Sequence, residues 1–275
     1  MKRAVTIQDI SCFGKCSLTV ALPVVSAMGV ECAIIPTAVL STHTGGFKGF
    51  TFRDLTDDIP RIADHWKKEN IAFDGVYTGY LGSPEQAQMI SDFIDTFAPP
   101  LVFVDPAMAD NGKLYTGFTE DIVVAMRKLC AKADMIVPNL TEATFLLGEE
   151  FRRPGEYDEQ YVRDILVKLT KLGAKQATLT GVIYDGKHQG AVSYDSRTGE
   201  FTEYFSDNLL KSYHGTGDIF SSAMFGAMMR DKTVAESIKI AVEYTVDCMK
   251  HTDGDDNHWY GVKFEECIPD LTKML

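Results

Sequence analysis

Short apolar runs alternate with longer amphipathic segments along most of the chain. The apolar runs have the length of buried strands and fall at residues 4–7, 32–40, 75–78, 101–104, 135–137 and 176–179. Segments with helical spacing fall at residues 18–28, 54–68, 84–97, 119–131 and 158–172, and two more follow residue 218 and end near Met249. The alternation predicts an α/β fold in which a mostly parallel central sheet carries helices on both faces.

Residues 186–205 follow a different pattern. Residues 189–194 and 200–205 alternate polar and apolar side chains on either side of the polar segment 195–199. Such alternation around a turn predicts a small β-hairpin at the edge of the sheet. No repeat, low-complexity tract or linker divides the chain, so we expect residues 1–275 to form a single domain.

The composition limits the classes of partner. The 39 acidic and 27 basic residues give a formal net charge of -12, which disfavours general binding to nucleic acid or to an anionic membrane. The six cysteines show no zinc-site spacing, and no apolar run has the length of a signal peptide or a membrane span. We therefore expect a cytoplasmic protein that binds small molecules.

Polar or glycine-rich segments follow every predicted strand of the parallel sheet. They are Gln8-Asp9, residues 41–46, residues 79–82, Asp105-Pro106, Pro138-Asn139 and Thr180-Gly181. In open parallel sheets, ligands bind beyond the carboxyl ends of the strands. These segments are therefore expected to share one rim, and to form the binding site there.

The segment His214-Gly215-Thr216-Gly217-Asp218 immediately precedes an apolar stretch that is typical of a buried helix. Glycines at a helix N-terminus let backbone N–H groups approach an anion, and the helix dipole adds attraction for phosphate. A carboxylate among such donors is explained by a general base that takes the proton of a hydroxyl being phosphorylated, which indicates a kinase. Taken alone, the segment also fits an ordinary helix start with Asp218 as the N-cap.

Three further side chains suit a nucleotide with bound Mg²⁺. Asp105, Asn139 and Glu142 carry the oxygen ligands that Mg²⁺ requires. Each also has a structural explanation, because Asp105 before a proline shapes turns, and Asn139 with Glu142 three residues later fits a capping box. The chain contains neither a P-loop motif nor a dinucleotide fingerprint, so phosphate binding is expected at residues 214–218.

As a set, these motifs resemble the ribokinase-like superfamily and, within it, the pyridoxal, pyridoxine and pyridoxamine kinases. The resemblance runs in order through residues 7–8, 41–45, 78–83, 104–106, 138–142 and 215–218. It implies a ribokinase-like fold and a kinase that uses ATP and Mg²⁺ to phosphorylate the 5'-hydroxyl of a B6 vitamer. It also implies a homodimer and a monovalent cation, often potassium, near the anion-binding segment.

The resemblance further implies roles for single residues. Asp218 would be the catalytic base, and the amides of Gly215, Thr216 and Gly217 would bind the transferred phosphoryl group. The vitamer would contact His43, Thr44, Tyr80 and Asp218, with Asp9 at a position where many relatives have serine. The nucleotide and Mg²⁺ would be held by Asp105, Asp110, Tyr115, Asn139, Glu142, Thr180, Gly181, Gly215 and Gly217, with Asp105 and Glu142 serving the metal.

Two other functions stay open. Hydroxymethylpyrimidine kinases of thiamin synthesis share the fold, and His214 before Gly-Thr-Gly is reminiscent of them, although they usually have a cysteine where this chain has Asp218. Outside the enzymes, a non-catalytic regulator that binds a vitamin or nucleotide is the alternative, but such a protein has no need of the base. ADP release with hydroxylated pyridines and pyrimidines would separate the three.

Overall fold

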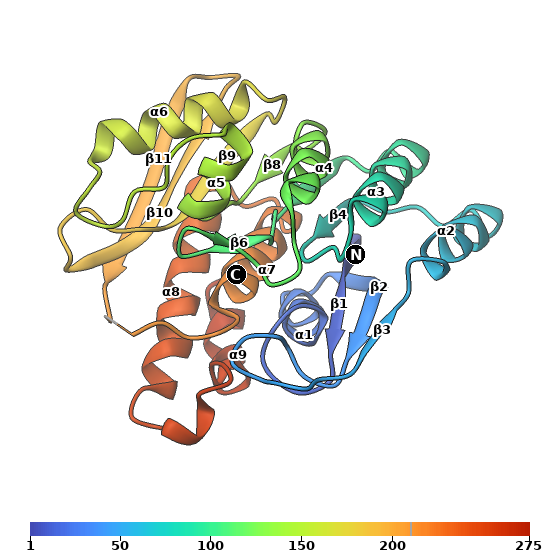
Figure 1. The fold of residues 1–275 in the computed structure, drawn as a ribbon, viewed down its shortest axis with the longest axis horizontal. Coiled ribbons are helices and arrows are strands. Elements are labelled where there is room, and N and C mark those ends of the chain that lie inside the picture. Colours follow the sequence, from blue (N-terminus) through green and yellow to red (C-terminus); the bar gives the residue numbers. More distant parts are fainter. Residues whose placement is uncertain (210) are drawn as a thin grey trace.

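The computed structural model describes residues 1–209 and 211–275, in which nine strands form one sheet of order β11-β10-β9-β8-β5-β4-β1-β2-β3 (Figure 1). These strands are β1 (Arg3–Ser11), β2 (Glu31–Leu40), β3 (Phe52–Asp54), β4 (Gly75–Thr78), β5 (Leu101–Val104), β8 (Met135–Ile136), β9 (Gln176–Val182), β10 (His188–Asp195) and β11 (Glu200–Asp207). A separate two-stranded sheet consists of β6 (Ala109–Asp110) and β7 (Lys113–Leu114).

The strands β2, β1, β4, β5, β8 and β9 pair in parallel. Antiparallel strands close both edges, with β3 beside β2 and the β10–β11 hairpin beside β9. The predicted mostly parallel sheet and the predicted edge hairpin are therefore confirmed.

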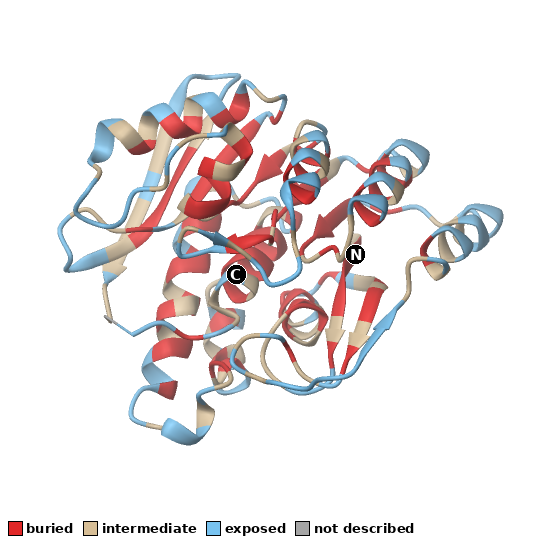
Figure 2. Cartoon of the chain, viewed as in Figure 1, coloured by how far each residue is buried: buried red, intermediate tan, exposed pale blue. Residues whose placement is uncertain are grey.

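Helices cover both faces of the sheet. They are α1 (Leu18–Ala27), α2 (Asp58–Lys68), α3 (Pro84–Phe97), α4 (Glu120–Cys130), α5 (Leu140–Leu147), α6 (Glu159–Thr170), α7 (Thr216–Met229), α8 (Val234–Thr252) and α9 (Phe264–Lys273). Helices α2 to α6 pack on the face that carries Val5 and Val76, whereas α1, α7, α8 and α9 pack on the face that carries Ala4 and Tyr77. Neighbouring residues of one strand thus enter opposite layers, and Figure 2 shows the buried sides of the helices turned towards the sheet. Within the described residues, none of these helices is both long and apolar enough to cross a bilayer.

Strand β1 extends beyond the predicted residues 4–7. Its pairing with β2 continues to Ser11 past an irregularity, where Asp9 faces two residues of β2 between the Gln8–Pro36 and Ile10–Val39 pairs. Proline has no N–H to donate to a neighbouring strand, which fits a bulge directly after Pro36. The pairing with β4 already ends at Ile7. Asp9 therefore lies inside β1 and not after it, but on the β4 side it is already beyond the pairing.

Other boundaries differ from the sequence expectation as well. The helix predicted from residue 54 begins only at Asp58, because Asp54 belongs to β3 and its carboxylate accepts hydrogen bonds from the backbone and hydroxyl of Thr56. Strand β9 continues past residue 179 to Val182, since β10 pairs with it there. The sequence did not predict β3, β6, β7 and α9, and it indicated α5 only through the capping box.

Candidate active site

Asp218 lies in the first turn of α7. Gly215, at φ 78°, is the N-cap residue, so Asp218 is the third residue of the helix and its interpretation as the N-cap is wrong. Burial of its carboxyl group, together with the nearby carboxylates of Asp105 and Asp9, raises the pKa of Asp218 to about 8, although a hydrogen bond from the backbone N–H of Ser17 opposes this rise. Three acidic side chains from β1, α7 and the end of β5 thus lie together.

The two glycines before Asp218 have different surroundings. A Cβ atom on Gly215 would lie 1.6 Å from the carbonyl oxygen of Lys15. For Gly217, no heavy atom of the described residues outside its own helix turn lies within 4 Å of the Cβ position. The first turn of α7 has no capping side chain, and the described residues supply no acceptor for the N–H groups of residues 216–218. Thr216 directs its hydroxyl back to the Tyr213 carbonyl at 3.2 Å. This helix N-terminus is therefore open to an anion.

Asp9 is 4% exposed, and its Oδ2 accepts a hydrogen bond of 3.0 Å from the Ser11 hydroxyl. Burial raises the pKa of Asp9, and hydrogen bonding from the side chains of Ser17 and Ser11 opposes this rise. Ser17 is the N-cap of α1, with φ 56° and ψ -135°, a conformation that non-glycine residues rarely adopt. Its backbone N–H serves Asp218 and its side chain serves Asp9, so this strained residue joins the two carboxyl groups.

Asp105 follows β5 and is 7% exposed. Ser221 of α7 donates a hydrogen bond of 2.7 Å to its Oδ2, and burial raises the pKa of Asp105 to about 6. Within the described residues, no group of three or more His, Cys, Asp or Glu side chains is arranged to hold a metal by itself. A divalent cation at Asp105 would therefore take most of its ligands from water and nucleotide oxygens, as Mg²⁺ commonly does.

Asn139 and Glu142 form the predicted capping box at the start of α5. The Asn139 side chain accepts from the backbone N–H of Glu142 at 2.9 Å, and Glu142 Oε2 accepts from the backbone N–H of Asn139 at 2.9 Å. Glu142 Oε1 accepts from the backbone N–H of Met108 at 3.1 Å. Both Glu142 oxygens thus have backbone donors, and the structure favours the structural explanation of this residue over direct metal ligation.

The small β6–β7 sheet lies against the start of α5. The Asn139 amide donates to the Ala109 carbonyl at 2.9 Å, and the backbone N–H of Gly112 donates to the Thr141 hydroxyl at 3.1 Å. Asp110 is exposed in β6, with its carboxylate bound to the backbone and side chain of Asn111. The hairpin and the capped helix therefore form one unit beside Asp105.

Two tyrosines lie near these carboxylates. Tyr80 stacks on Phe118 with ring centroids 5.3 Å apart, and burial together with the charge of Asp9 raises its pKa to about 12. Tyr115 is 36% exposed, and burial of its hydroxyl, followed by the charges of Glu142 and Asp105, raises its pKa well above the usual value. The residues after β4 and after β7 thus meet at Phe118.

His43 belongs to a group of rings from three separate loops. Its Nε2 lies 2.8 Å from the Tyr260 carbonyl, its Nδ1 accepts from the backbone N–H of Gly45, and its ring centroid is 5.3 Å from that of His214. It is therefore a satisfied, buried histidine that also contacts the segment before Gly215. Thr44 is exposed.

Thr180 and Gly181 lie inside β9, where the backbone N–H of Thr180 donates to the Pro138 carbonyl at 3.0 Å and Thr180 pairs with Asn139. They therefore lie beside the start of α5.

Sequence reasoning missed Ser17 and Ser221. Ser221 is found by helical spacing, since it follows Asp218 by three residues, but nothing in the sequence indicates the backbone conformation of Ser17.

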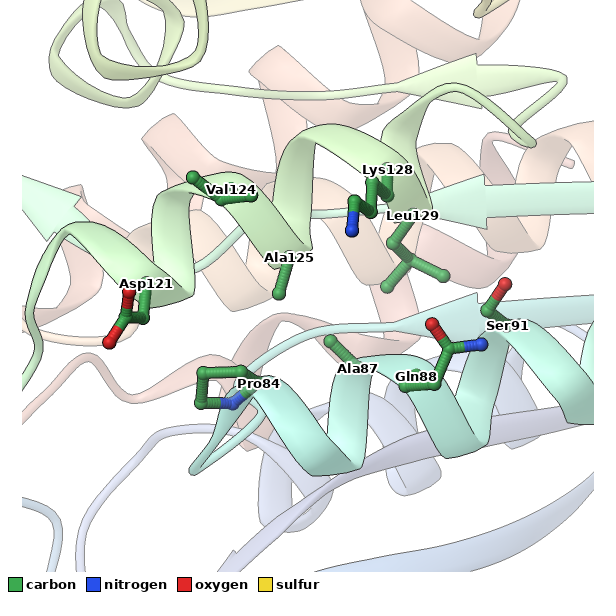
Figure 3. A pocket seen from close by; sticks show the side chains of 9 residues that line it. All are labelled: Pro84, Ala87, Gln88, Ser91, Asp121, Val124, Ala125, Lys128 and Leu129. Atoms are coloured by element: carbon green, nitrogen blue, oxygen red, sulfur yellow. The ribbon is translucent and has the colours of Figure 1, made fainter.

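A hollow between α3 and α4 is lined by Pro84, Ala87, Gln88, Ser91, Asp121, Val124, Ala125, Lys128 and Leu129 (Figure 3). It contains none of the predicted site residues.

Comparison with known proteins shows the family of the chain. The family model described as phosphomethylpyrimidine kinase matches residues 20–260. A Bacteroides thetaiotaomicron VPI-5482 protein classed with the phosphomethylpyrimidine kinases and crystallised with pyridoxal is 36% identical, with a TM-score of 0.93 over 98% of this chain and 95% of its own. Pyridoxal kinase from Lactobacillus plantarum is 30% identical, with a TM-score of 0.91 over 100% of this chain and 98% of its own.

Among curated proteins, the hydroxymethylpyrimidine/phosphomethylpyrimidine kinase of Aquifex aeolicus is 24% identical over 67% of this chain and 70% of its own. The pyridoxal kinase of Dictyostelium discoideum is 26% identical over 84% and 80%. Both kinds of enzyme are thus similar to this chain over most of its length, and the predicted ribokinase-like resemblance is confirmed. The chain belongs to the phosphomethylpyrimidine kinase family.

Proposed function

We propose that the protein transfers the terminal phosphoryl group of ATP to the 5'-hydroxyl of a B6 vitamer. Asp218 is the general base, and the backbone amides of Gly215, Thr216 and Gly217 bind the transferred group. The observation that carries the proposal is a carboxyl group with a pKa raised to about 8 beside a helix N-terminus that lacks a cap. A binding protein has no use for a titratable group at this position.

In this mechanism the substrate hydroxyl donates a hydrogen bond to Asp218, which takes the proton as the oxygen bonds to phosphorus. The bond between that phosphorus and the bridging oxygen of ATP breaks, and ADP leaves. The open N–H groups of α7 stabilise charge on the phosphoryl oxygens, and the helix dipole adds to this effect. Most of the work is positioning, because phosphoryl transfer leaves little covalent chemistry to the protein.

Family membership implies ATP and a divalent cation, and Asp105 is the side chain that fits the cation. Its Oδ1 has no protein donor among the described residues, and the burial that raises its pKa to about 6 marks a carboxyl group without a cationic partner. When bound, Mg²⁺ supplies positive charge to the phosphate oxygens. Glu142 would act on it only through water, since both its oxygens accept backbone N–H groups.

The raised pKa of Asp218 has a mechanistic consequence. A carboxyl group with a pKa of about 8 is mostly protonated at pH 7 and then cannot accept a proton. Positive charge beside Asp105 or Asp9 removes part of the repulsion that holds the pKa up. We infer that Asp218 becomes an effective base only when both substrates are present, which limits wasteful hydrolysis of ATP.

The remaining contacts belong to the same proposal. Tyr80, His43, Thr44 and Asp9 contact the vitamer, while Asn139, Asp110, Tyr115, Thr180 and Gly181 border the nucleotide. A homodimer, a monovalent cation such as potassium and a cytoplasmic location follow from the resemblance and stay predictions.

Hydroxymethylpyrimidine kinase is the second candidate function. The family description and the Aquifex aeolicus relative favour it, whereas the pyridoxal bound to the Bacteroides thetaiotaomicron protein and the Lactobacillus plantarum enzyme favour the vitamer. Coupled ADP release with pyridoxal, pyridoxine, pyridoxamine and hydroxymethylpyrimidine distinguishes the two by kcat/KM. A preference for the pyrimidine contradicts the vitamer assignment. Ligand binding without any ADP release contradicts both and indicates a regulator.

A further inference from the structure

Asp9 is a buried acid with unused hydrogen-bonding capacity. It is 4% exposed, and its donors are the hydroxyls of Ser11 and Ser17 and its own backbone N–H. No basic side chain pairs with it in the described parts of the chain, and the basic residue of the following loop, Lys15, pairs instead with Glu265 of α9. A carboxylate can accept about four hydrogen bonds, so these three neutral donors still leave room for a donor from a ligand.

Such a group is costly unless something compensates it. A buried charge without a cationic or strongly donating partner destabilises the protein, and neighbouring carboxylates add repulsion. Asp9 has such neighbours, since its charge acts on both Asp218 and Tyr80. Its contribution to stability in the empty site is therefore unfavourable, which indicates that the compensating partner comes with a ligand.

Ser17 holds Asp9 close to Asp218, the proposed base. Its backbone N–H bonds Asp218, and its side chain bonds Asp9, so the two acids lie on either side of one residue. Asp9 is therefore close enough to Asp218 to meet a substituent beside the hydroxyl that Asp218 accepts.

We propose that Asp9 is a specificity-determining residue that selects acceptor alcohols with a nitrogen donor on the ring carbon next to the one bearing the hydroxymethyl group. The proposal rests on the proposed kinase function and names its substrate class. An amino or ammonium group there donates to Asp9 and offsets its charge, and charge-assisted hydrogen bonds are about twice as strong as neutral ones. A hydroxyl or aldehyde at the same position offers a weaker donor or none.

Both a pyridine and a pyrimidine substrate can present such a nitrogen donor, and in each class a matched pair of compounds differs at that group. Pyridoxamine and pyridoxine differ only by an amino group in place of a hydroxyl group. Hydroxymethylpyrimidine has an amino group on the ring carbon beside its hydroxymethyl carbon, and 5-hydroxymethyl-2-methylpyrimidine lacks it. Within each pair, the ratio of kcat/KM values measures recognition of the nitrogen donor and cancels effects common to both compounds.

The experiment measures both ratios by coupled ADP release in the wild type, Asp9→Asn, Asp9→Ser and the control Asp64→Asn, which changes an exposed aspartate of α2. The wild type is expected to prefer the aminated compound of the pair it accepts. Asp9→Asn and Asp9→Ser are expected to lower that preference about 10- to 100-fold, mainly through KM of the aminated compound. Asp64→Asn is expected to keep the wild-type ratio.

An unchanged ratio in both Asp9 variants overturns the proposal, as does a wild type that prefers the compound without the amino group. Melting curves identify a variant that fails to fold, and the ratio is then taken from the other Asp9 variant. ADP release with an unaltered ratio leaves the kinase assignment standing and removes only this inference. Absence of ADP release with these four compounds and with pyridoxal overturns the proposed function, and this inference with it.

Discussion

Two helix N-termini border the carboxyl groups of the site, and their backbone donors are satisfied in opposite ways. At the start of α5, Asn139 and Glu142 close the first turn with reciprocal hydrogen bonds, and Glu142 also binds the loop after β5. At the start of α7, Gly215 caps without a side chain and the first N–H groups have no partner in the described residues. Both segments suggested phosphate or metal binding in the sequence, yet only α7 keeps its donors available to a ligand. The acid in each turn differs accordingly, because Glu142 bonds the backbone around α5, whereas Asp218 in α7 is the group that we propose as the base.

The largest expected effect concerns Asp218, the proposed base in the first turn of α7, which we call the open turn because its N–H groups have no partner in the described residues. Asp218→Asn keeps the size of the side chain but removes the proton acceptor, so kcat should fall by about 10² to 10⁴ while ATP binding changes little. Steady-state ADP release and nucleotide titration measure the two quantities. Asp64→Asn serves as the control. An unchanged kcat in Asp218→Asn would contradict the assignment of Asp218 as the base.

The two glycines of the open turn provide the next test. Gly215→Ala should prevent stable folding, because φ 78° is strained for alanine and the new Cβ would overlap the Lys15 carbonyl oxygen at 1.6 Å. Gly217→Ala should fold normally and gain about 0.5–1 kcal/mol from helix propensity, since its Cβ meets open space. It should nevertheless raise KM for ATP, because the methyl group crowds the N–H groups. Melting curves and kinetics check both, and a well-folded Gly215→Ala would contradict the geometry.

The contrast between these helix starts also shows what the sequence could and could not predict. Periodicity predicted the sheet and its edge hairpin, and for α3 it also predicted both ends correctly, because long apolar patterns reflect burial. Local motifs predicted the capping box correctly but could not tell that Gly215, and not Asp218, caps α7. The bond between Ser17 and the two acids was unpredictable, since a backbone at φ 56° is imposed by tertiary contacts. The single-domain organisation stays a prediction.

A smaller effect is expected at the capped start of α5. Glu142→Gln replaces one carboxylate oxygen by an NH₂ group that would face a backbone N–H of Asn139 or Met108. One buried donor then loses its acceptor, which should lower the free energy of unfolding by about 1–3 kcal/mol. Denaturant unfolding measures this loss, and kcat should fall far less than in Asp218→Asn. A loss of turnover without a loss of stability would instead assign Glu142 to the metal.

The same change from acid to amide should have the opposite sign in the open turn. The folded protein raises the pKa of Asp218 to about 8 from the usual value near 4, so between these limits the folded state holds a proton that the unfolded chain releases. The contribution of Asp218 to stability therefore declines as pH rises from about 4 to about 8, and Asn at this position removes that decline. Without ligands, Asp218→Asn should melt above the wild type, and by a larger margin at pH 8 than at pH 5. Melting curves across this range check the trend. An equal difference in melting temperature at both pH values would mean that the pKa of Asp218 is close to its usual value. Asp218 would then already be deprotonated at neutral pH before its substrates bind.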